Sequence, residues 1–192
     1  MRALMLGAPG SGKGTQGARI AERYGVPHIS TGELLRAHVD LGTETGRAAR
    51  ASMERGDLVP DLLIAAVILG RLAESDPSRG FVLDGFPRTL QQAQAAYGVA
   101  KETGMTFDAV LCLDIPHDEL MRRLDERGRS KGRADDEEGT IRHRIEVYEE
   151  KTAPLREYYE ARGIFLPIDA NGTVDEVTER IFAALDRLTD SS

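Results

Sequence analysis

The chain contains the stretch Gly7-Ala8-Pro9-Gly10-Ser11-Gly12-Lys13-Gly14-Thr15, which decides how the rest of the sequence is interpreted. The apolar run 3–6 precedes it and predicts a buried strand, and the helical pattern that follows ends at Gly25. A strand, a glycine-rich turn, a lysine and a helix, in that order, are the context of a phosphate-binding P-loop. Such a turn directs backbone N–H groups and the positive end of the helix dipole towards a phosphate chain. The alternative is a glycine-rich turn that only connects a strand to a helix.

Lys13 is the residue expected to reach the outer phosphate oxygens. It is the only lysine among the first hundred residues, so a generally basic surface does not explain its place in the loop. The general P-loop pattern has Ser or Thr directly after the lysine, whereas this chain has Gly14 there and Thr15 next. That departure argues against an ordinary GTPase or motor ATPase and favours a subgroup whose loop ends in Gly-Lys-Gly-Thr.

The length and composition predict one soluble domain. The 192 residues allow a substantial core, and a net charge of −7 argues against a protein that coats nucleic acid. The longest apolar run, 62–69, is too short for a bilayer and predicts a buried helical segment; without a signal-peptide pattern, we expect a cytoplasmic protein. Cys112 lies in an apolar run and predicts a buried structural thiol, and its spacing from the four histidines is not that of a zinc site.

Apolar runs and helical patterns alternate along the chain. This alternation predicts an α/β fold, a three-layer P-loop architecture with a central five-stranded parallel sheet and helices on both faces. In such a fold the ligand site lies at the carboxyl ends of the strands. The strands are expected at 2–6, 26–29, 80–84, 108–114 and 164–168, and the helices at 13–24, 31–40, 45–55, 61–75, 89–104, 117–127, 136–162 and 174–188.

Two segments interrupt the simple alternation. Residues 30–60 carry more helical patterns than one crossover needs, which predicts a small helical subdomain. Residues 128–132 form a polar, glycine-flanked stretch between two long helical patterns. An exposed loop of that kind over a ligand site is typical of a lid, and the alternative is an ordinary helix–helix turn.

An apolar strand ends at Asp84, and Arg88 follows after a short turn. An aspartate at the end of a buried strand beside a P-loop is the usual second anchor for Mg²⁺, reached through water. The alternative is that Asp84 caps the next helix, which the intervening Pro87 disfavours. We therefore expect Asp84 and Arg88 to face the phosphate-binding edge.

Arginines are crowded in the second half of the chain. Arg123 and Arg127 are four residues apart on a predicted helix, and like charges at that spacing cost a few tenths of a kcal/mol. Arg129 and Arg133 flank the following loop, and Arg144 lies beside an apolar stripe. For any single arginine a salt bridge is an alternative, but the set as a whole indicates an anionic ligand.

The ordered motifs resemble the adenylate kinase family, whose members interconvert ATP plus AMP with two ADP and so maintain the balance of adenine nucleotides. The resemblance extends over the whole chain, as a single domain 1–192 with an inserted nucleoside-monophosphate-binding (NMP-binding) subdomain at 30–59 and a short lid at 127–133. Long-lid members often carry four zinc-binding cysteines, which this chain lacks, so no structural zinc is implied. The resemblance rests on the motifs 7–15, 30–36, 56–60, 83–88 with Gln92, 127–129 with 132–136, and 151–155.

The resemblance also implies a set of site residues. Asp84 would organise Mg²⁺ through water. Lys13, Arg88, Arg127, Arg133 and Arg144 would be the catalytic residues, neutralising charge without a general base. ATP would be held by Gly10, Ser11, Gly12, Lys13, Gly14, Thr15, Arg127 and Gly172. AMP would be held by Thr31, Arg36, Asp57, Leu58, Val59, Gly85, Phe86, Pro87, Arg88, Gln92, Arg133 and Arg144.

The implied partners are ATP, AMP and ADP, with no nucleic acid or membrane, and the implied state is a monomer. Gln92 favours adenine because a glutamine amide can pair a donor and an acceptor with one edge of that base. Two alternatives stay open at this point. One is a kinase of pyrimidine monophosphates, which shares most of the motifs, and the other is a switch that binds ATP without transferring phosphate.

Overall fold

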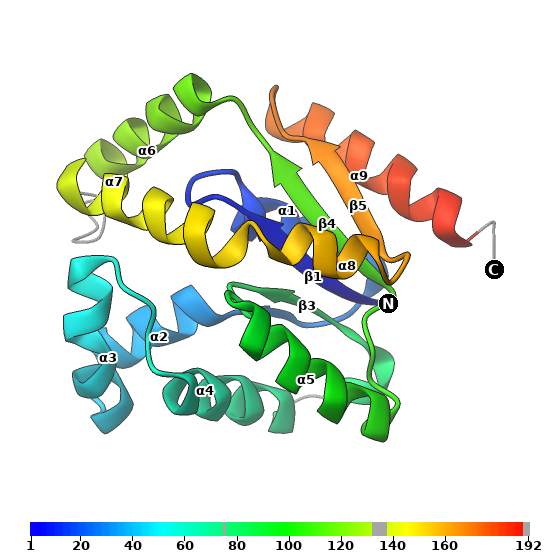
Figure 1. The fold of residues 1–192 in the computed structure, drawn as a ribbon, viewed down its shortest axis with the longest axis horizontal. Coiled ribbons are helices and arrows are strands. Elements are labelled where there is room, and N and C mark those ends of the chain that lie inside the picture. The colour runs from blue at the N-terminus through cyan, green and yellow to red at the C-terminus, as the bar shows by residue number, and fades with distance from the viewer. Residues whose placement is uncertain (75, 132–137, 190–192) are drawn as a thin grey trace.

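The structure is a computed structural model that describes residues 1–74, 76–131 and 138–189 (Figure 1). Within these residues, five strands form one parallel sheet in the order β2-β3-β1-β4-β5. The predicted α/β class and five-stranded parallel sheet are confirmed. The strands are β1 (Arg2–Gly7), β2 (His28–Ser30), β3 (Phe81–Asp84), β4 (Ala109–Asp114) and β5 (Phe165–Asp169).

The strands β1, β3 and β4 alternate their side chains between two cores, one on each face of the sheet. Ala3 and Met5 of β1 belong to the core beneath α1 (Lys13–Tyr24) and α9 (Val174–Thr189). Leu4 and Leu6 belong to the opposite core, which is covered by α4 (Asp61–Ala73), α5 (Leu90–Thr103) and α8 (Leu155–Glu160). Because both faces are buried, the strands are continuous apolar runs, each large side chain contributing about 1.5–3 kcal/mol on burial.

Residues 30–60 form a helical hairpin beside the sheet, followed by α4. It consists of α2 (Thr31–Asp40) and α3 (Glu44–Arg55), which lie against each other (Figure 1). Thr43 caps α3 by accepting a hydrogen bond from the N–H of Gly46 at 3.1 Å. A Cβ on Gly46 would lie 2.0 Å from the carbonyl oxygen of His38, so only glycine permits this close approach.

The region that carries the predicted lid differs from the expectation. Helix α6 (His117–Lys131) continues through residues 128–131, so the predicted loop is wrong there; residue 132 lies outside the described residues. Gly128 costs a helix only about 1 kcal/mol, and the basic residues that flank it are good helix formers.

The predicted single helix 136–162 is also divided. Helix α7 (Glu138–Val147) passes into a π-helical turn, η3 (Tyr148–Thr152), before α8. Pro154 has no N–H to donate, and Ala153 donates instead to the carbonyl oxygen of Tyr148 at 2.8 Å. A short 3₁₀ turn, η1 (Pro77–Arg79), precedes β3.

Two expectations about apolar residues have different outcomes. Cys112 is buried in β4, as predicted, and burial raises the pKa of its thiol to about 11. The run 62–69 is helical, but Leu62 and Leu69 face outward, with 85% and 65% of their surfaces exposed. In the part of the chain that the structure describes, no helix is both long and apolar enough to cross a bilayer.

Candidate active site

The loop between β1 and α1 is shaped by glycines. Gly7 has a φ of 140°, and a Cβ there would lie 2.9 Å from the carbonyl oxygen of Leu113 in β4. Gly10 has a φ of 91°, and its Cβ would collide with Leu124 of α6 at 2.7 Å. Side chains at these two positions would force the loop off the sheet edge. The loop leads directly into α1, whose first residue is Lys13, so the positive end of a 12-residue helix faces the loop.

The partly buried side chain of Lys13 contacts the loop that precedes it. Its Nζ donates hydrogen bonds to the carbonyl oxygens of Gly7 and Ala8, at 2.8 and 2.9 Å. Burial lowers the pKa of this ammonium to about 8, an effect that the carboxylate of Asp84 partly offsets. The positive charges of Arg88, Arg144 and Arg127 lower it further. Three of the predicted catalytic arginines are therefore close enough to act electrostatically on Lys13.

Two cavities meet at Arg88 and Arg144. The large cavity, of about 490 Å³, extends from the glycine-rich loop towards α6 and the start of α9. The small cavity, of about 50 Å³, lies between α2, the end of α3 and the loop after β3. Both are lined by Gly32, Arg36, Gly85, Arg88 and Arg144. An anion in either cavity would therefore share its arginines with an anion in the other.

The sequence profile of the adenylate kinase family matches residues 5–164. The chain belongs to the adenylate kinase family. It is similar to the adenylate kinases of Thermobifida fusca (strain YX), with 49% identity over 96% of this chain and 98% of the relative, and of Kocuria rhizophila, with 48% identity over 97% and 99%. The adenylate kinase of Bacteroides fragilis (strain YCH46) is 45% identical, over 96% of this chain and 98% of the relative.

Adenylate kinases transfer a phosphoryl group from ATP to AMP and so produce two ADP, and this chain is an enzyme of that kind. Most of the residues predicted to bind nucleotides line the two cavities. The large cavity includes Gly10–Thr15, Arg36, Asp84, Gly85, Arg88, Arg127, Arg144 and Gly172. The small cavity includes Arg36, Asp57, Leu58, Val59, Gly85, Phe86, Arg88, Gln92 and Arg144.

Two of the predicted residues that the structure describes line neither of these cavities. Thr31 is fully buried and donates from its hydroxyl to the carbonyl oxygen of Asp84 at 3.2 Å, outside the lining of both cavities. Pro87 follows a cis peptide bond from Phe86 and lines a third cavity, of about 80 Å³, which Lys13 and Tyr148 also line. Arg133 lies outside the described residues, so its role stays a prediction.

Asp84 ends β3 directly beside the glycine-rich loop. It is 7% exposed and accepts a hydrogen bond from the Ser30 hydroxyl at 3.4 Å. The helix α5 is capped by Thr89 instead, so the alternative role of Asp84 as a helix cap is wrong.

Glu33 is a carboxylate within the motif 30–36, and it is not among the site residues that the resemblance implies. A Cβ at Gly14 would lie 3.8 Å from a carboxylate oxygen of Glu33 and 3.9 Å from one of Asp84. Carboxylate oxygens are ligands suited to Mg²⁺ or to its bound water, so this pair fits the metal that adenylate kinases use with ATP. One signal could have identified Glu33: it follows the end of β2 by three residues, and Ser30 there pairs in register with Asp84.

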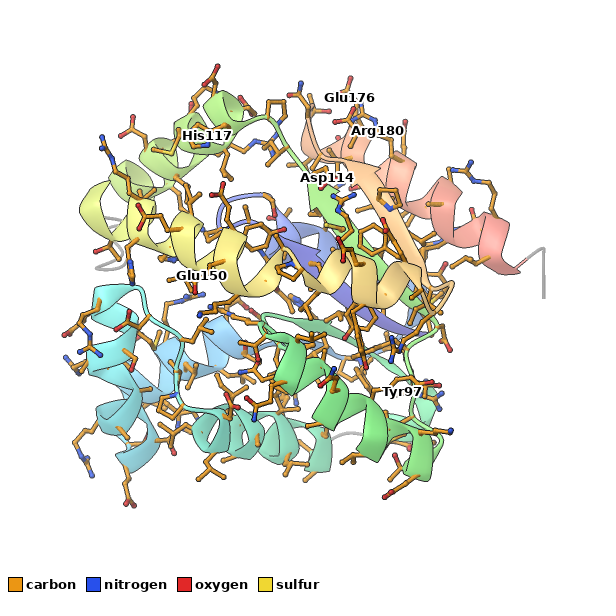
Figure 2. The ribbon with its side chains drawn as sticks, in the orientation of Figure 1. Tyr97, Asp114, His117, Glu150, Glu176 and Arg180 are labelled. Carbon is orange, nitrogen blue, oxygen red and sulfur yellow. The ribbon has the colours of Figure 1, made fainter. Side chains whose placement is uncertain are left out.

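The loop after β5 forms the far wall of the large cavity and is held on several sides. Arg123 donates to the carbonyl oxygens of Ala170 and Gly172, both at 3.0 Å, and pairs with Glu119 at 2.7 Å. Arg180 donates to the carbonyl of Asn171, and Glu176 accepts from the N–H of Thr173; Figure 2 shows both side chains on α9 near this loop. For Arg123 the predicted alternative of a salt bridge is therefore confirmed.

Proposed function

We propose that the large cavity holds ATP, the small cavity holds AMP, and the phosphoryl group passes between them. The observation that carries this proposal is the shared lining. Arg36, Arg88 and Arg144 border both cavities, and the field of Arg88 and Arg144 reaches Lys13. A protein that only binds ATP as a switch needs one anion-binding pocket. Two anion-binding pockets that share their arginines suit the transfer of a phosphoryl group from one phosphate to another.

The residues would act by position and charge. Lys13 and the N–H groups of residues 10–15 would hold the phosphates of ATP, with Arg127 alongside and Gly172 near the adenine. Arg88 and Arg144 would neutralise the oxygens of the transferring group, together with Arg133. Loss of one such preorganised contact typically costs about 3 kcal/mol of transition-state stabilisation. No residue needs to act as a general base, because phosphoryl transfer depends mainly on alignment and charge neutralisation.

The carboxylates of Asp84 and Glu33, which line the large cavity, would hold the Mg²⁺ that accompanies ATP. When bound, the ion supplies positive charge that neutralises the phosphate oxygens. Asp84 would hold it through water, as predicted from the sequence, and Glu33 would supply the second carboxylate.

The AMP site would use the small cavity and its helical walls. Arg36 would hold the AMP phosphate, and the 57–59 backbone and the Gly85–Arg88 turn would enclose the nucleotide. Gln92 would face the base. Thr31 would support the Gly85–Arg88 turn through its hydrogen bond to the carbonyl oxygen of Asp84. The hairpin 30–59 would then be an NMP-binding subdomain, and residues 127–133 a short lid, whose closure excludes water that competes for the phosphoryl group. We expect the protein to act as a cytoplasmic monomer.

The test is to mix the protein with ATP, Mg²⁺ and one of AMP, CMP, UMP or GMP, and to measure nucleoside diphosphates by chromatography. ADP with AMP, and little product with the others, is the expected result. The Lys13→Ala variant should fold and show no turnover. Preference for a pyrimidine monophosphate, or a titration that finds one bound nucleotide where two are offered, would contradict the proposal.

A further inference from the structure

The side-chain amide of Gln92 is held at both ends. Gln92 lies on α5, is 6% exposed and lines the small cavity. Its Oε1 accepts a hydrogen bond from the backbone N–H of Arg88 at 2.7 Å. Its Nε2 donates to a carboxylate oxygen of Asp61 at 2.6 Å, across 31 positions of sequence. Asp61 is the first residue of α4, and it does not line the small cavity.

These two contacts allow one orientation of the amide. A flip about the last torsion of Gln92 would exchange its oxygen and nitrogen. The oxygen would then face the carboxylate of Asp61, which only accepts hydrogen bonds, and the NH₂ group would face the N–H of Arg88, which only donates. Both new contacts would be repulsive, so the two partners enforce the same orientation.

A fixed amide presents a fixed hydrogen-bonding pattern to the cavity. An amide has two N–H donors and two acceptor lone pairs, and Asp61 and Arg88 each use one. One donor and one acceptor therefore remain, in a set order. The edge of adenine offers an acceptor at N1 and a donor at its 6-amino group. A 6-oxopurine offers the reverse, a donor at N1 and an acceptor at O6, so an amide that could flip would suit either base.

We infer that Asp61 is a specificity-determining residue that makes the AMP site select 6-aminopurine over 6-oxopurine monophosphates. This inference rests on the proposed function, because it requires the base of AMP to face Gln92. Asp61 does not reach the cavity itself, so it is a positioning residue that acts through Gln92.

The experiment compares AMP with IMP as acceptors, with ATP as donor. IMP differs from AMP by having O6 and N1–H, without the extra amino group of guanine. The variant is Asp61→Asn, whose amide can either accept from Gln92 or donate to it. We expect its ratio of kcat/KM for AMP over IMP to fall by about tenfold, the size of one well-placed base contact. The KM for ATP should stay unchanged.

Glu44→Gln is the matched control. Glu44 is an exposed acidic residue in the first turn of α3, so this change removes the same charge at the same place in a neighbouring helix. It should lower the melting temperature no more than Asp61→Asn does, because Asp61 also accepts a hydrogen bond from Gln92, and it should leave the AMP-to-IMP ratio unchanged.

The outcomes separate this inference from the proposed function. A lower ratio in Asp61→Asn and an unchanged one in Glu44→Gln support it. If wild type phosphorylates AMP and the ratio stays constant in Asp61→Asn, the selectivity role is overturned and the proposed function stands. An equal loss with both acceptors would also overturn it, since that is the effect of a purely structural residue. A wild type that fails to phosphorylate AMP would overturn both.

Discussion

The hydroxyl of Thr152 donates a hydrogen bond to the backbone carbonyl of Arg88 at 2.8 Å, although the two residues are 64 positions apart. Thr152 is buried at the end of the π-helical turn η3. Arg88 is further held by the bond from its Nε to the carbonyl of Gly85 at 2.8 Å and by Gln92. The π-turn is thus attached to Arg88, one of the arginines that border both the large and the small cavity, which gives the motif 151–155 a structural role.

Thr152→Val should weaken catalysis more than its effect on folding explains. Valine keeps the shape of threonine and removes the donor, which leaves the Arg88 carbonyl without this partner at a cost of about 1–3 kcal/mol. We expect kcat/KM for AMP to fall about tenfold, with a smaller change in KM for ATP, measured in a coupled assay. Thr152→Ser, which keeps the hydroxyl, should restore most of the activity.

Tyr158→Phe is the control for Thr152→Val. It removes another hydroxyl that bonds a backbone carbonyl of a distant segment, that of Ala93 at 3.5 Å, and neither Tyr158 nor Ala93 lines a cavity described above. Its kinetics should match wild type. If both variants lose activity in proportion to stability, Thr152 has no special effect on Arg88.

The affinity for ATP should depend on pH through Lys13. Its pKa of about 8 lies below the ordinary 10.5, chiefly because of burial, so free Lys13 is charged below pH 8 and loses its proton above it. Bound phosphates favour the charged form. We therefore expect the Kd for ATP to be nearly constant from pH 6.5 to 7.5 and to rise above pH 8, by up to about tenfold per pH unit. Titration calorimetry in two buffers should show proton uptake on binding near pH 9.

The same shift predicts the effect of Lys13 on folding. Between pH 8 and 10.5 the folded state binds fewer protons at Lys13 than the unfolded state does, so this residue makes the unfolding free energy rise with pH there.

Lys13→Arg, which stays charged, should remove the pH dependence of ATP binding. An affinity that is equally flat in wild type up to pH 9.5 would contradict the assigned pKa.

Gln92→Ala should raise the KM for AMP much more than the KM for ATP. The change removes the amide from the wall of the small cavity. Gln92 does not line the large cavity. We expect a rise of about tenfold or more for AMP, the size of one bidentate base contact. Steady-state kinetics with each nucleotide varied in turn gives both constants. Equal effects on ATP and AMP would refute the assignment of Gln92 to the adenine of AMP.

His143 links α7 to the segment after α3, and this link should affect stability in acid. The side chain of His143 bonds the carboxylate of Asp57 at 2.8 Å, and this contact, followed by that of Arg55, holds the pKa of Asp57 below its ordinary 3.8. A lowered carboxyl pKa stabilises the fold above the unfolded pKa, and the contribution is lost as pH falls through the folded pKa. We expect His143→Ala to be less stable than wild type at pH 5, with the difference shrinking towards pH 3.

Urea unfolding at pH 5, 4 and 3 measures this difference. His117→Ala is the control, because His117 is an exposed histidine at the start of α6 (Figure 2). A difference between wild type and His143→Ala that stays constant over this pH range would show that the contact does not act through Asp57.

Local patterns were enough for the elements of the sheet and for the phosphate loop. The strands are short apolar runs because both faces of a parallel sheet are covered. Such runs can be recognised in the sequence without knowing which strands pair with each other. The glycine-rich loop before Lys13 can also be recognised from the sequence, because the freedom to adopt a positive φ belongs to each glycine by itself. The break at Pro154 and the continuation of α6 past Gly128 were missed, since both depend on how neighbouring turns share their hydrogen bonds.

For the candidate active site, too, the sequence predicts some features and only the tertiary structure decides the others. Which residues can carry phosphate chemistry follows from their types and from their spacing within one segment, as in 7–15 and 83–88. Which residues act together does not, because Asp61 meets Gln92 and Thr152 meets Arg88 only after α4, α5 and η3 have packed. Hydrogen bonds act over about 3 Å, whereas these partners are tens of positions apart, so only the packed structure selects them.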